Sequence, residues 1–377
     1  MKKKISRGSY NVQFLFTVLF LIGFGVLMVY NASVAYAGDA FGEKYYFFFL
    51  QIGWAIIGLI GMVIVSRIEL EYIQKIAPTL MWITLGLLVF VLIPTWFAPA
   101  VNGARRWIYL NPSPLPDFPF IGRLGFQPSD LAKVMFSIYF ADVVTRFKLG
   151  KIKKDYLKIL LVVLATVGLV YLEPDFDTSV LMLVIAIAIL FVAGVPYFYF
   201  LFGVPLASIL GFLFIISSDY RRERLFTFFS PEKTNLAESG YHITQILIAL
   251  GSGGLMGVGL GNSVQKYGFL PEVTADSIFA IIGEEFGFIG SSFIIMILGF
   301  FLVKGYEIAK NAKTDFGRFV TTGIMIWMSS QVFLNLMAMV KILPLTGVPL
   351  PLLSYGGSSM VFGLLGLGIV LNVSKNG

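Results

Sequence analysis

Long apolar segments dominate this sequence and restrict its fold more than any other feature. A helix that crosses the apolar core of a membrane needs about 20 mostly apolar residues. Ten segments approach or reach that length: residues 12–35, 45–66, 76–97, 131–144, 159–172, 179–195, 197–217, 278–303, 319–340 and 359–373. The chain is 57% hydrophobic and only 13% charged, whereas soluble domains carry about 25% charged residues. The sequence therefore predicts an all-α integral membrane protein with ten transmembrane helices, forming a single polytopic domain over residues 1–377.

Three of these segments have features of their own. The uncharged stretch 178–218 is too long for one span, and Gly194-Val-Pro196 is expected to divide it into two helices. Segment 159–172 is short, so a tilted or broken helix or a locally thinned bilayer is expected there. Segment 131–144 carries Lys133 and Asp142, and charged side chains at membrane depth are expected to face the bundle interior or a wet cavity.

Charge and composition exclude several classes of protein. The basic start Met1–Arg7 followed by an apolar run resembles a secretory signal, but the run to Tyr30 exceeds the usual length of about 7–15 residues, so an uncleaved first helix is predicted. Ten spans place both termini on one side, and most of the 28 Lys and Arg residues fall there, which predicts cytoplasmic termini. The net charge of +7 includes no basic run outside membrane-flanking loops, so no nucleic-acid partner is expected. The absence of Cys and the single His242 argue against disulfides, a histidine metal cluster or a Ser-His-Asp triad.

The longest connection, residues 219–276, joins the seventh and eighth predicted spans on the outer side. It is too apolar for a disordered segment, so we expect an ordered extracytoplasmic loop with interfacial or re-entrant helices. Asp276 ends this loop, just ahead of a segment that is charge-free from Phe286 to Val303. A carboxylate at a membrane edge is costly unless it is solvated or used, which makes Asp276 the first candidate for chemistry.

Two cationic motifs are expected on the outer side. Asn102-Gly-Ala-Arg-Arg-Trp-Ile108 places Arg105 and Arg106 beside Trp107. Guanidinium groups bind phosphate in a bidentate manner, and the alternative is simple anchoring at the membrane interface. Asp219-Tyr-Arg-Arg-Glu-Arg224 suits anionic lipid or pyrophosphate, but a solvated run next to the membrane is an equally good interpretation.

Lys133 and an acidic cluster form a second group of candidates. Lys133 lies one turn into its predicted helix, where pairing within the bundle, for example with Glu173, is as well supported as contact with a substrate. The cluster Glu173-Pro-Asp-Phe-Asp177 could hold a divalent cation through oxygen ligands. Ion pairing with Arg105, Arg106 or Lys133 is the favoured interpretation.

Two glycine-rich stretches complete the motifs. Gly257-Val-Gly-Leu-Gly261 lacks the preceding strand and acidic partner of a dinucleotide site, so its glycines are expected to allow tight turns and close packing. Residues 343–359 contain three prolines and three glycines, which predicts an irregular segment that lines the same outward cavity as Asp276.

Together these motifs resemble the SEDS (shape, elongation, division and sporulation) family of bacterial peptidoglycan polymerases. The resemblance covers nearly the whole chain and rests on residues 102–107, 127–133, 173–178, 251–276, 283–285 and 349–359. Residues 29–33 and 257–266 resemble the division branch, FtsW, whereas residues 345–351 lean towards the elongation branch, RodA. The family's usual Pro-Glu-Ala-His-Thr-Asp-Phe motif departs here, because Val273, Thr274, Ala275 and Ser277 surround the retained Glu272 and Asp276.

The resemblance implies a glycosyltransferase that polymerises lipid II on the outer face of the bacterial cytoplasmic membrane, at the division septum. The donor would be a glycan on undecaprenyl pyrophosphate, and Asp276 would be the catalytic base. The expected substrate-binding residues are Arg105, Arg106, Trp107, Lys133, Glu173, Gln245, Glu272 and Ser354. The expected partners are a class B penicillin-binding protein, which is a transpeptidase, and membrane proteins of the division complex. No cofactor is assigned beyond the divalent cation considered above.

Other functions remain open at this stage. Ten spans with charged residues inside the membrane also suit a lipid II flippase, although polar residues gather on the outer side rather than on both. An elongation-type polymerase is a further alternative, and a division scaffold would tolerate the loss of Asp276.

Overall fold

The computed structural model describes residues 10–101, 103–113, 115–116, 123–148, 156–217, 219–229 and 238–376. Asn102, the residues before Tyr10 and part of the predicted loop 219–276 lie outside them. The described chain is almost entirely helical. Its helices are α1 (Val12–Phe41), α2 (Tyr46–Val65), α3 (Leu70–Leu92), α4 (Pro128–Lys148), α5 (Tyr156–Leu172), α6 (Phe176–Val192), α7 (Tyr197–Ile216), α8 (Asp219–Phe229), α9 (Glu238–Gly253), α10 (Ile278–Lys310), α11 (Asp315–Met339) and α12 (Gly357–Asn376).

Each of the ten predicted segments overlaps one long helix, and α8 and α9 fall within the predicted loop 219–276. Among the described residues, six helices are long and apolar enough to cross a membrane, namely α1, α2, α3, α10, α11 and α12. Shorter apolar helices lie within α5, α6 and α7. The predicted division at 194–196 is confirmed, because α6 ends at Val192 and α7 begins at Tyr197. One difference from an all-α fold is a pair of two-residue antiparallel strands, β1 (Ile108–Tyr109) and β2 (Gly125–Phe126).

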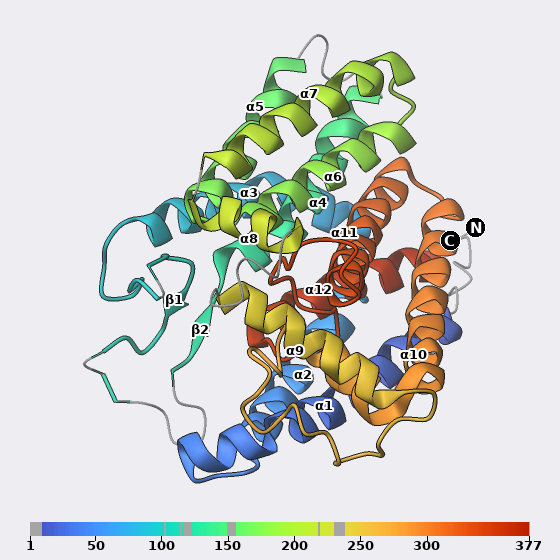
Figure 1. The fold of residues 1–377 in the computed structure, drawn as a ribbon. Helices are drawn as coiled ribbons and strands as arrows, with labels where there is room; N and C mark the ends of the chain where they lie inside the picture. The colour runs from blue at the N-terminus through green and yellow to red at the C-terminus, as the bar shows by residue number, and fades with distance from the viewer. Residues whose placement is uncertain are drawn as a thin grey trace.

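Helices α4, α11 and α12 form the centre of the bundle, and the other long helices pack around them (Figure 1). The central position of α4 explains how it carries charge. Asp130, Lys133 and Asp142 are at most 7% exposed, and the Lys133 ammonium lies 2.6 Å from Asp130 Oδ1 and 5.0 Å from the centre of the Trp327 ring. The predicted interior position of these charges is confirmed. Lys133 pairs within the bundle, as one of the two interpretations expected, but its partner is Asp130, one helical turn away on the same face, and not Glu173.

The two ends of the described chain lie side by side (Figure 1). The Asn11 amide donates to Ser374 Oγ over 3.2 Å, and the Lys375 ammonium lies 5.5 Å from the centre of the Tyr10 ring. The first and last helices therefore begin and end at the same end of the bundle.

Helix α10 is broken at Gly287, where the backbone has φ 65° and ψ −166°; the sequence had predicted one uninterrupted span. In a continuous helix Phe288 N would donate to Glu284 O, and Ile289 N would donate to Glu285 O. Instead, these two amides donate to Gly254 O and Leu255 O over 2.9 and 3.1 Å. The two carbonyls that are released accept from Val258 N and Gly259 N, each over 3.0 Å. The segment 254–259 thus replaces the helical hydrogen bonds at the break.

Glycine is required where the two backbones meet. Gly257 has φ 81°, and a Cβ there would collide with the Glu285 carbonyl; a Cβ at Gly287 would collide with the Gly257 amide. The expectation that the glycines of residues 257–261 serve tight turns and close packing is confirmed.

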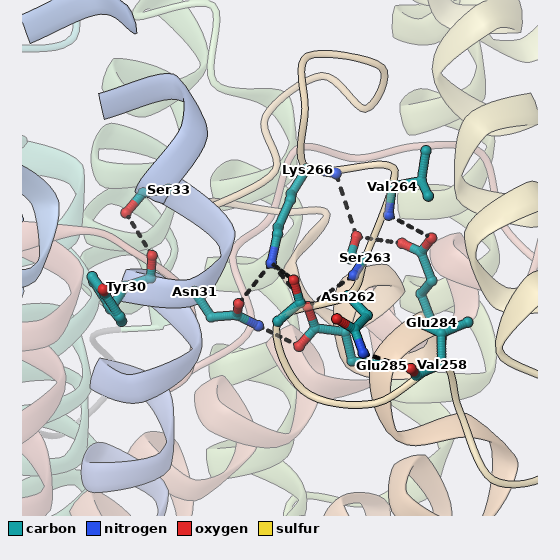
Figure 2. A network of polar contacts seen from close by, with 11 residues as sticks. Tyr30, Asn31, Ser33, Val258, Asn262, Ser263, Val264, Lys266, Glu284 and Glu285 are labelled. Carbon is teal, nitrogen blue, oxygen red and sulfur yellow. Dashed lines mark hydrogen bonds and ion pairs between the residues drawn. The ribbon is translucent and has the colours of Figure 1, made fainter. Parts of the chain in front are cut away.

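A buried polar network fixes the segment after this contact (Figure 2). The Lys266 ammonium donates to Gly261 O over 2.6 Å and Asn31 Oδ1 over 2.9 Å, and it lies 3.3 Å from Glu285 Oε1. Asn31 Nδ2 donates to the other oxygen of Glu285. Ser263 Oγ and Val264 N donate to Glu284. Lys266 and Glu285 are at most 2% exposed, so the network joins α1, α10 and the loop between α9 and α10 through a buried ion pair.

Replacing Lys266 with Met is expected to destabilise the protein by about 3–5 kcal/mol, because it leaves the Glu285 carboxylate buried without its partner. The double variant Lys266→Met/Glu285→Gln should recover at least half of the lost stability. Thermal melting in detergent micelles measures both.

Lys304→Met is the matched control. The Lys304–Glu307 pair is 2.8 Å long, but the Glu307 side chain is 48% exposed, so its loss should cost about 0–1 kcal/mol. Equal melting temperatures for Lys266→Met and the wild-type protein would contradict the assignment.

Candidate active site

Asp276 lies in the turn 272–277 that leads into α10, and three other parts of the chain hold this turn. Tyr355 N, from the segment before α12, donates to Thr274 O over 2.8 Å. Asn335 Nδ2, from α11, donates to Asp276 O over 2.8 Å and to Val348 O over 2.9 Å. His242 Nε2, from α9, lies 2.7 Å from Ser277 Oγ. The position of Asp276 therefore depends on segments that are far apart in the sequence.

The carboxyl group of Asp276 combines partial burial with a raised pKa. The residue is half-buried, yet its Oδ1 atom is enclosed and has no hydrogen-bond partner among the described residues. Burial, followed by the neighbouring Glu272 carboxylate, raises the pKa of Asp276 to about 6, against the opposing effects of its own backbone hydrogen bond and the Arg224 charge. Unpaired buried polar atoms and shifted pKa values are typical of functional sites.

Arg224, from α8, is the cation whose charge acts on Asp276. Its Nη1 atom donates to Leu345 O over 3.1 Å, which connects α8 to the segment 343–356. A small recess beside it is lined by Arg224, Thr227, Phe228, Ile243 and Leu345. The irregular segment 343–356 adjoins Asp276 as predicted, since a Cβ at Gly347 would lie 3.7 Å from Asp276 Oδ2.

A second polar cluster lies where α4 and α6 begin. Arg106 Nε donates to Glu173 O over 3.0 Å, and its Nη2 donates to Pro174 O. Gln127 Nε2 and Ser129 Oγ donate to Asp175 Oδ2 over 3.2 and 3.3 Å. Arg106 therefore binds main-chain carbonyls of the acidic motif, rather than the carboxylate pairing expected from the sequence.

Glu173 is fully buried, and neither of its carboxylate oxygens has a hydrogen-bond partner among the described residues. Burial, followed by the charge of Asp175, raises its pKa to about 9 against the opposing charge of Arg106. Glu173 therefore keeps its proton at neutral pH and can act as a neutral hydrogen-bond donor.

The acidic motif does not fit a metal site built from three carboxylates. Asp175 Oδ2 accepts from Gln127 and Ser129, and Asp175 Oδ1 accepts from Thr178 N at the start of α6. Within the described ranges, no three His, Asp or Glu side chains gather closely enough to hold a metal ion.

The two clusters lie at the same end of the bundle and are linked through the segment before α12. Gln127 N donates to Ser358 Oγ over 2.9 Å, three residues beyond the Tyr355 amide that holds the Asp276 turn. Within the described residues, however, no hydrogen bond or ion pair joins Asp276 directly to Arg106, Lys133 or Glu173.

The remaining predicted residues occupy varied positions. Arg105 Nη1 donates to Ala98 O over 2.6 Å, and Trp107 and Gln245 are half-buried. Ser354 Oγ accepts from Leu350 N over 2.8 Å, so its hydroxyl already serves the backbone of its own segment. Glu272 is exposed. Substrate contact by these residues stays a prediction.

Sequence reasoning missed two neighbours of Asp276. His242 was considered only as a metal ligand or triad member, and Asn335 was not considered at all. Neither belongs to a motif near Asp276 in sequence, so only the packing of α9 and α11 reveals them. The signal in the sequence is that His242 is the single His of the chain.

The fold and this site define a multi-pass helical membrane protein with a buried carboxylate at one end of its bundle. Residues 12–377 match the family described as cell cycle protein, comprising FtsW, RodA and SpoVE. The chain therefore belongs to the FtsW, RodA and SpoVE family, as its SEDS-like motifs predicted.

The sequences of two relatives align with almost the whole chain. It is 37% identical over 368 residues to a probable peptidoglycan glycosyltransferase FtsW of Saccharophagus degradans, covering 96% of this chain and 92% of that protein. It is 34% identical over 361 residues to stage V sporulation protein E of Bacillus subtilis, covering 95% and 94%.

Two solved structures share the fold. A chain from a peptidoglycan synthase complex, studied for its coordination of polymerization and crosslinking, aligns with a TM-score of 0.77 at 25% identity, covering 97% of this chain and 98% of that chain. The rod shape determining protein RodA of Thermus thermophilus aligns with a TM-score of 0.68 at 25% identity and 97% coverage of both chains.

Because Glu173 is protonated in the folded protein, its contribution to stability depends on pH. Its folded pKa of about 9 exceeds its ordinary value of 4.5, so stability should fall as pH rises from about 4.5 to about 9. Glu173→Gln keeps the shape without the titrating proton. The variant should melt like the wild-type protein near pH 5 and at a higher temperature near pH 8. A lower melting temperature for the variant at both pH values would show that Glu173 is ionised.

Proposed function

We propose that this chain is a peptidoglycan glycosyltransferase that polymerises lipid II at the outer face of the bacterial cytoplasmic membrane. The observation that carries the proposal is Asp276, whose Oδ1 atom is enclosed and has no hydrogen-bond partner among the described residues and whose pKa is raised to about 6. Relatives at 34–37% identity bear the name probable peptidoglycan glycosyltransferase FtsW, which supports the same reaction class.

In the proposed topology, all ten long helices cross the membrane, both termini are cytoplasmic, and residues 219–276 form the extracytoplasmic loop that carries the catalytic motif. Support comes from the adjacent chain ends and from the six long apolar helices among the described residues. Lipid-facing side chains are also consistent, since Ile56, Ile60 and Ile64 of α2 are more than half exposed.

The proposed chemistry needs one base. The 4-hydroxyl of the acceptor sugar is a poor nucleophile at neutral pH, and Asp276 would take its proton as the oxygen attacks the anomeric carbon of the donor. The new C–O bond forms while the bond to pyrophosphate breaks, and the anomeric configuration inverts. Undecaprenyl pyrophosphate leaves with the electron pair of that bond as an anion and requires no protonation.

The developing negative charge calls for cations. Arg224 is the one whose charge acts on Asp276, and it lines the adjacent recess. Arg105, Arg106 and Lys133 are proposed to meet the substrate's anionic groups at the second cluster, with Trp107, Glu173, Gln245, Glu272 and Ser354 as further contacts. We propose that any divalent cation enters with the pyrophosphate, because Mg²⁺ is usually held by one or two carboxylates together with phosphate oxygens.

The proposed partners follow from the family. The solved relative comes from a complex that couples polymerization to crosslinking, which supports a transpeptidase partner, a class B penicillin-binding protein. A place in the division complex at the septum rests on the FtsW names of the relatives; a fluorescent fusion that marks the side wall instead would favour the elongation role.

Asp276→Asn is expected to lower the rate of polymerisation by at least ~100-fold, because the amide keeps the shape but cannot accept a proton. The assay uses purified protein with labelled lipid II, and thermal melting confirms the fold. Glu307→Gln is the control, since the Glu307 side chain is 48% exposed near the far end of α10 and its loss should leave most activity. Near-normal polymer from folded Asp276→Asn protein would exclude the base assignment.

The polymerisation rate is expected to rise with pH through about 6, because the base must be ionised and burial raises the pKa of Asp276 to that value. An unperturbed Asp would give this limb near pH 3.9. Initial rates between pH 4.5 and 8 measure the effect. A rate already at its plateau at pH 5 would contradict it.

The same lipid II assay separates polymerase from flippase. Polymer formed by the purified protein supports the proposal, whereas translocation of lipid II in vesicles without polymer would favour transport. Normal cell growth with Asp276→Asn would favour a scaffold.

A further inference from the structure

The turn that carries Asp276 has a conformation that its surroundings must impose. Glu272 has φ 47°, a region that residues other than glycine rarely adopt and that costs energy. The amides of Ala275 and Ser277 both donate to Glu272 O, over 3.1 and 3.3 Å, so the strained residue closes the turn. Such a turn keeps its shape only while neighbouring groups hold it.

Two of the three holding contacts act on main-chain carbonyls, and the third acts on a side chain. Tyr355 N and Asn335 Nδ2 bind the carbonyls of Thr274 and Asp276. The third contact joins His242 Nε2 of α9 to Ser277 Oγ over 2.7 Å. Ser277 is fully buried, so loss of His242 would leave the Ser277 hydroxyl buried without this hydrogen bond.

His242 is not needed to pack α9 onto the bundle. Ile243 and Ile246 of the same helix are 3% and 0% exposed and supply that apolar contact, whereas His242 is half-buried. Its polar contact to Ser277 is therefore separable from the packing of its helix.

The charge state of His242 suits a fixed hydrogen bond. Burial, together with the positive charge of Arg224, lowers its pKa to about 4. The charge that acts on it is that of Arg224 from α8; on the turn, its partner Ser277 directly follows Asp276, whose carboxyl group also feels the charges of Glu272 and Arg224. His242 thus stays neutral over the pH range in which Asp276 ionises, and a neutral imidazole offers one donor and one acceptor.

We propose that His242 is a positioning residue for the reaction: through Ser277 it fixes the backbone next to Asp276 and so directs the carboxylate towards the acceptor hydroxyl. The inference rests on the proposed function. It assigns His242 no proton transfer of its own, because the contact it makes is to Ser277 and not to a reacting atom.

The experiment compares four variants in the lipid II assay: His242→Leu, His242→Gln, Ser277→Ala and the double variant His242→Leu/Ser277→Ala. Errors of about 1 Å in placing a reacting group cost up to about 100-fold in rate, so His242→Leu and Ser277→Ala should each lower kcat by roughly 10–100-fold. Apparent KM for lipid II should change less than about 2-fold, because binding contacts are retained. The double variant should be no slower than either single variant, because both remove the same contact.

His242→Gln is the matched control. Its amide retains a donor and an acceptor near the Nε2 position, so it should keep most of the wild-type kcat, and the acidic limb near pH 6 should persist. Thermal melting of all four variants should lie close to that of the wild-type protein.

Three outcomes would overturn the inference. Wild-type kcat in His242→Leu, with Asp276→Asn inactive, would remove the positioning role and leave the proposed function intact. Loss of melting temperature in His242→Leu with no rescue of activity by His242→Gln would assign His242 to packing. Complete inactivity of His242→Gln would indicate that His242 takes part in the chemistry. Full activity of Asp276→Asn, or a wild-type protein that forms no polymer, would instead reject the proposed function itself, and the inference with it.

Discussion

The break of α10 at Gly287 releases two amides and two carbonyls, and the segment 254–259 satisfies all four. In an apolar bundle such groups cannot be left without partners, so this segment is tied to the broken helix. The tie is extended by the buried Lys266–Glu285 pair and by Asn31 of α1. The first half of α10 is thereby fixed on one side by the loop and on the other by α1, and Asp276 lies directly before it.

The ionisable side chains inside this protein are buried, so their charge states depend on neighbouring groups and not on solvent. Lys133 is neutralised by Asp130 on the same helix, and Lys266 by Glu285 across two segments. Glu173 and Asp276 have no such partner, and burial raises the pKa of both. The consequence differs with the extent of the shift: Glu173 remains protonated at neutral pH, whereas Asp276 can ionise near neutrality and is suited to accept a proton.

Assembly of the site depends on the irregular segment before α12. The Tyr355 amide of this segment donates to the turn that carries Asp276. Its Val348 and Leu345 carbonyls accept from Asn335 and Arg224. Directly after it, Ser358 Oγ accepts from Gln127 N. Its prolines and glycines prevent a helix, and the exposed carbonyls and amides become the contacts that join the two polar clusters. An irregular backbone at this place therefore serves as the connection between them.

The sequence by itself determined the class of fold, the ten long helices, the break at residues 194–196, the interior position of the charges on α4 and the prominence of Asp276. These follow from local properties: the length of apolar runs, the backbone limits of proline and glycine, and the cost of charge in lipid. The tertiary structure alone decided that Lys133 pairs with Asp130, that Arg106 binds carbonyls, that α10 is broken and that His242 and Asn335 reach the Asp276 turn. Apart from the Lys133–Asp130 pair, which lies within one helix, each of these depends on which helix faces lie together. The hydrogen bonds of Arg106, His242 and Asn335 join residues that are 67, 35 and 59 positions apart, and no local pattern encodes that geometry.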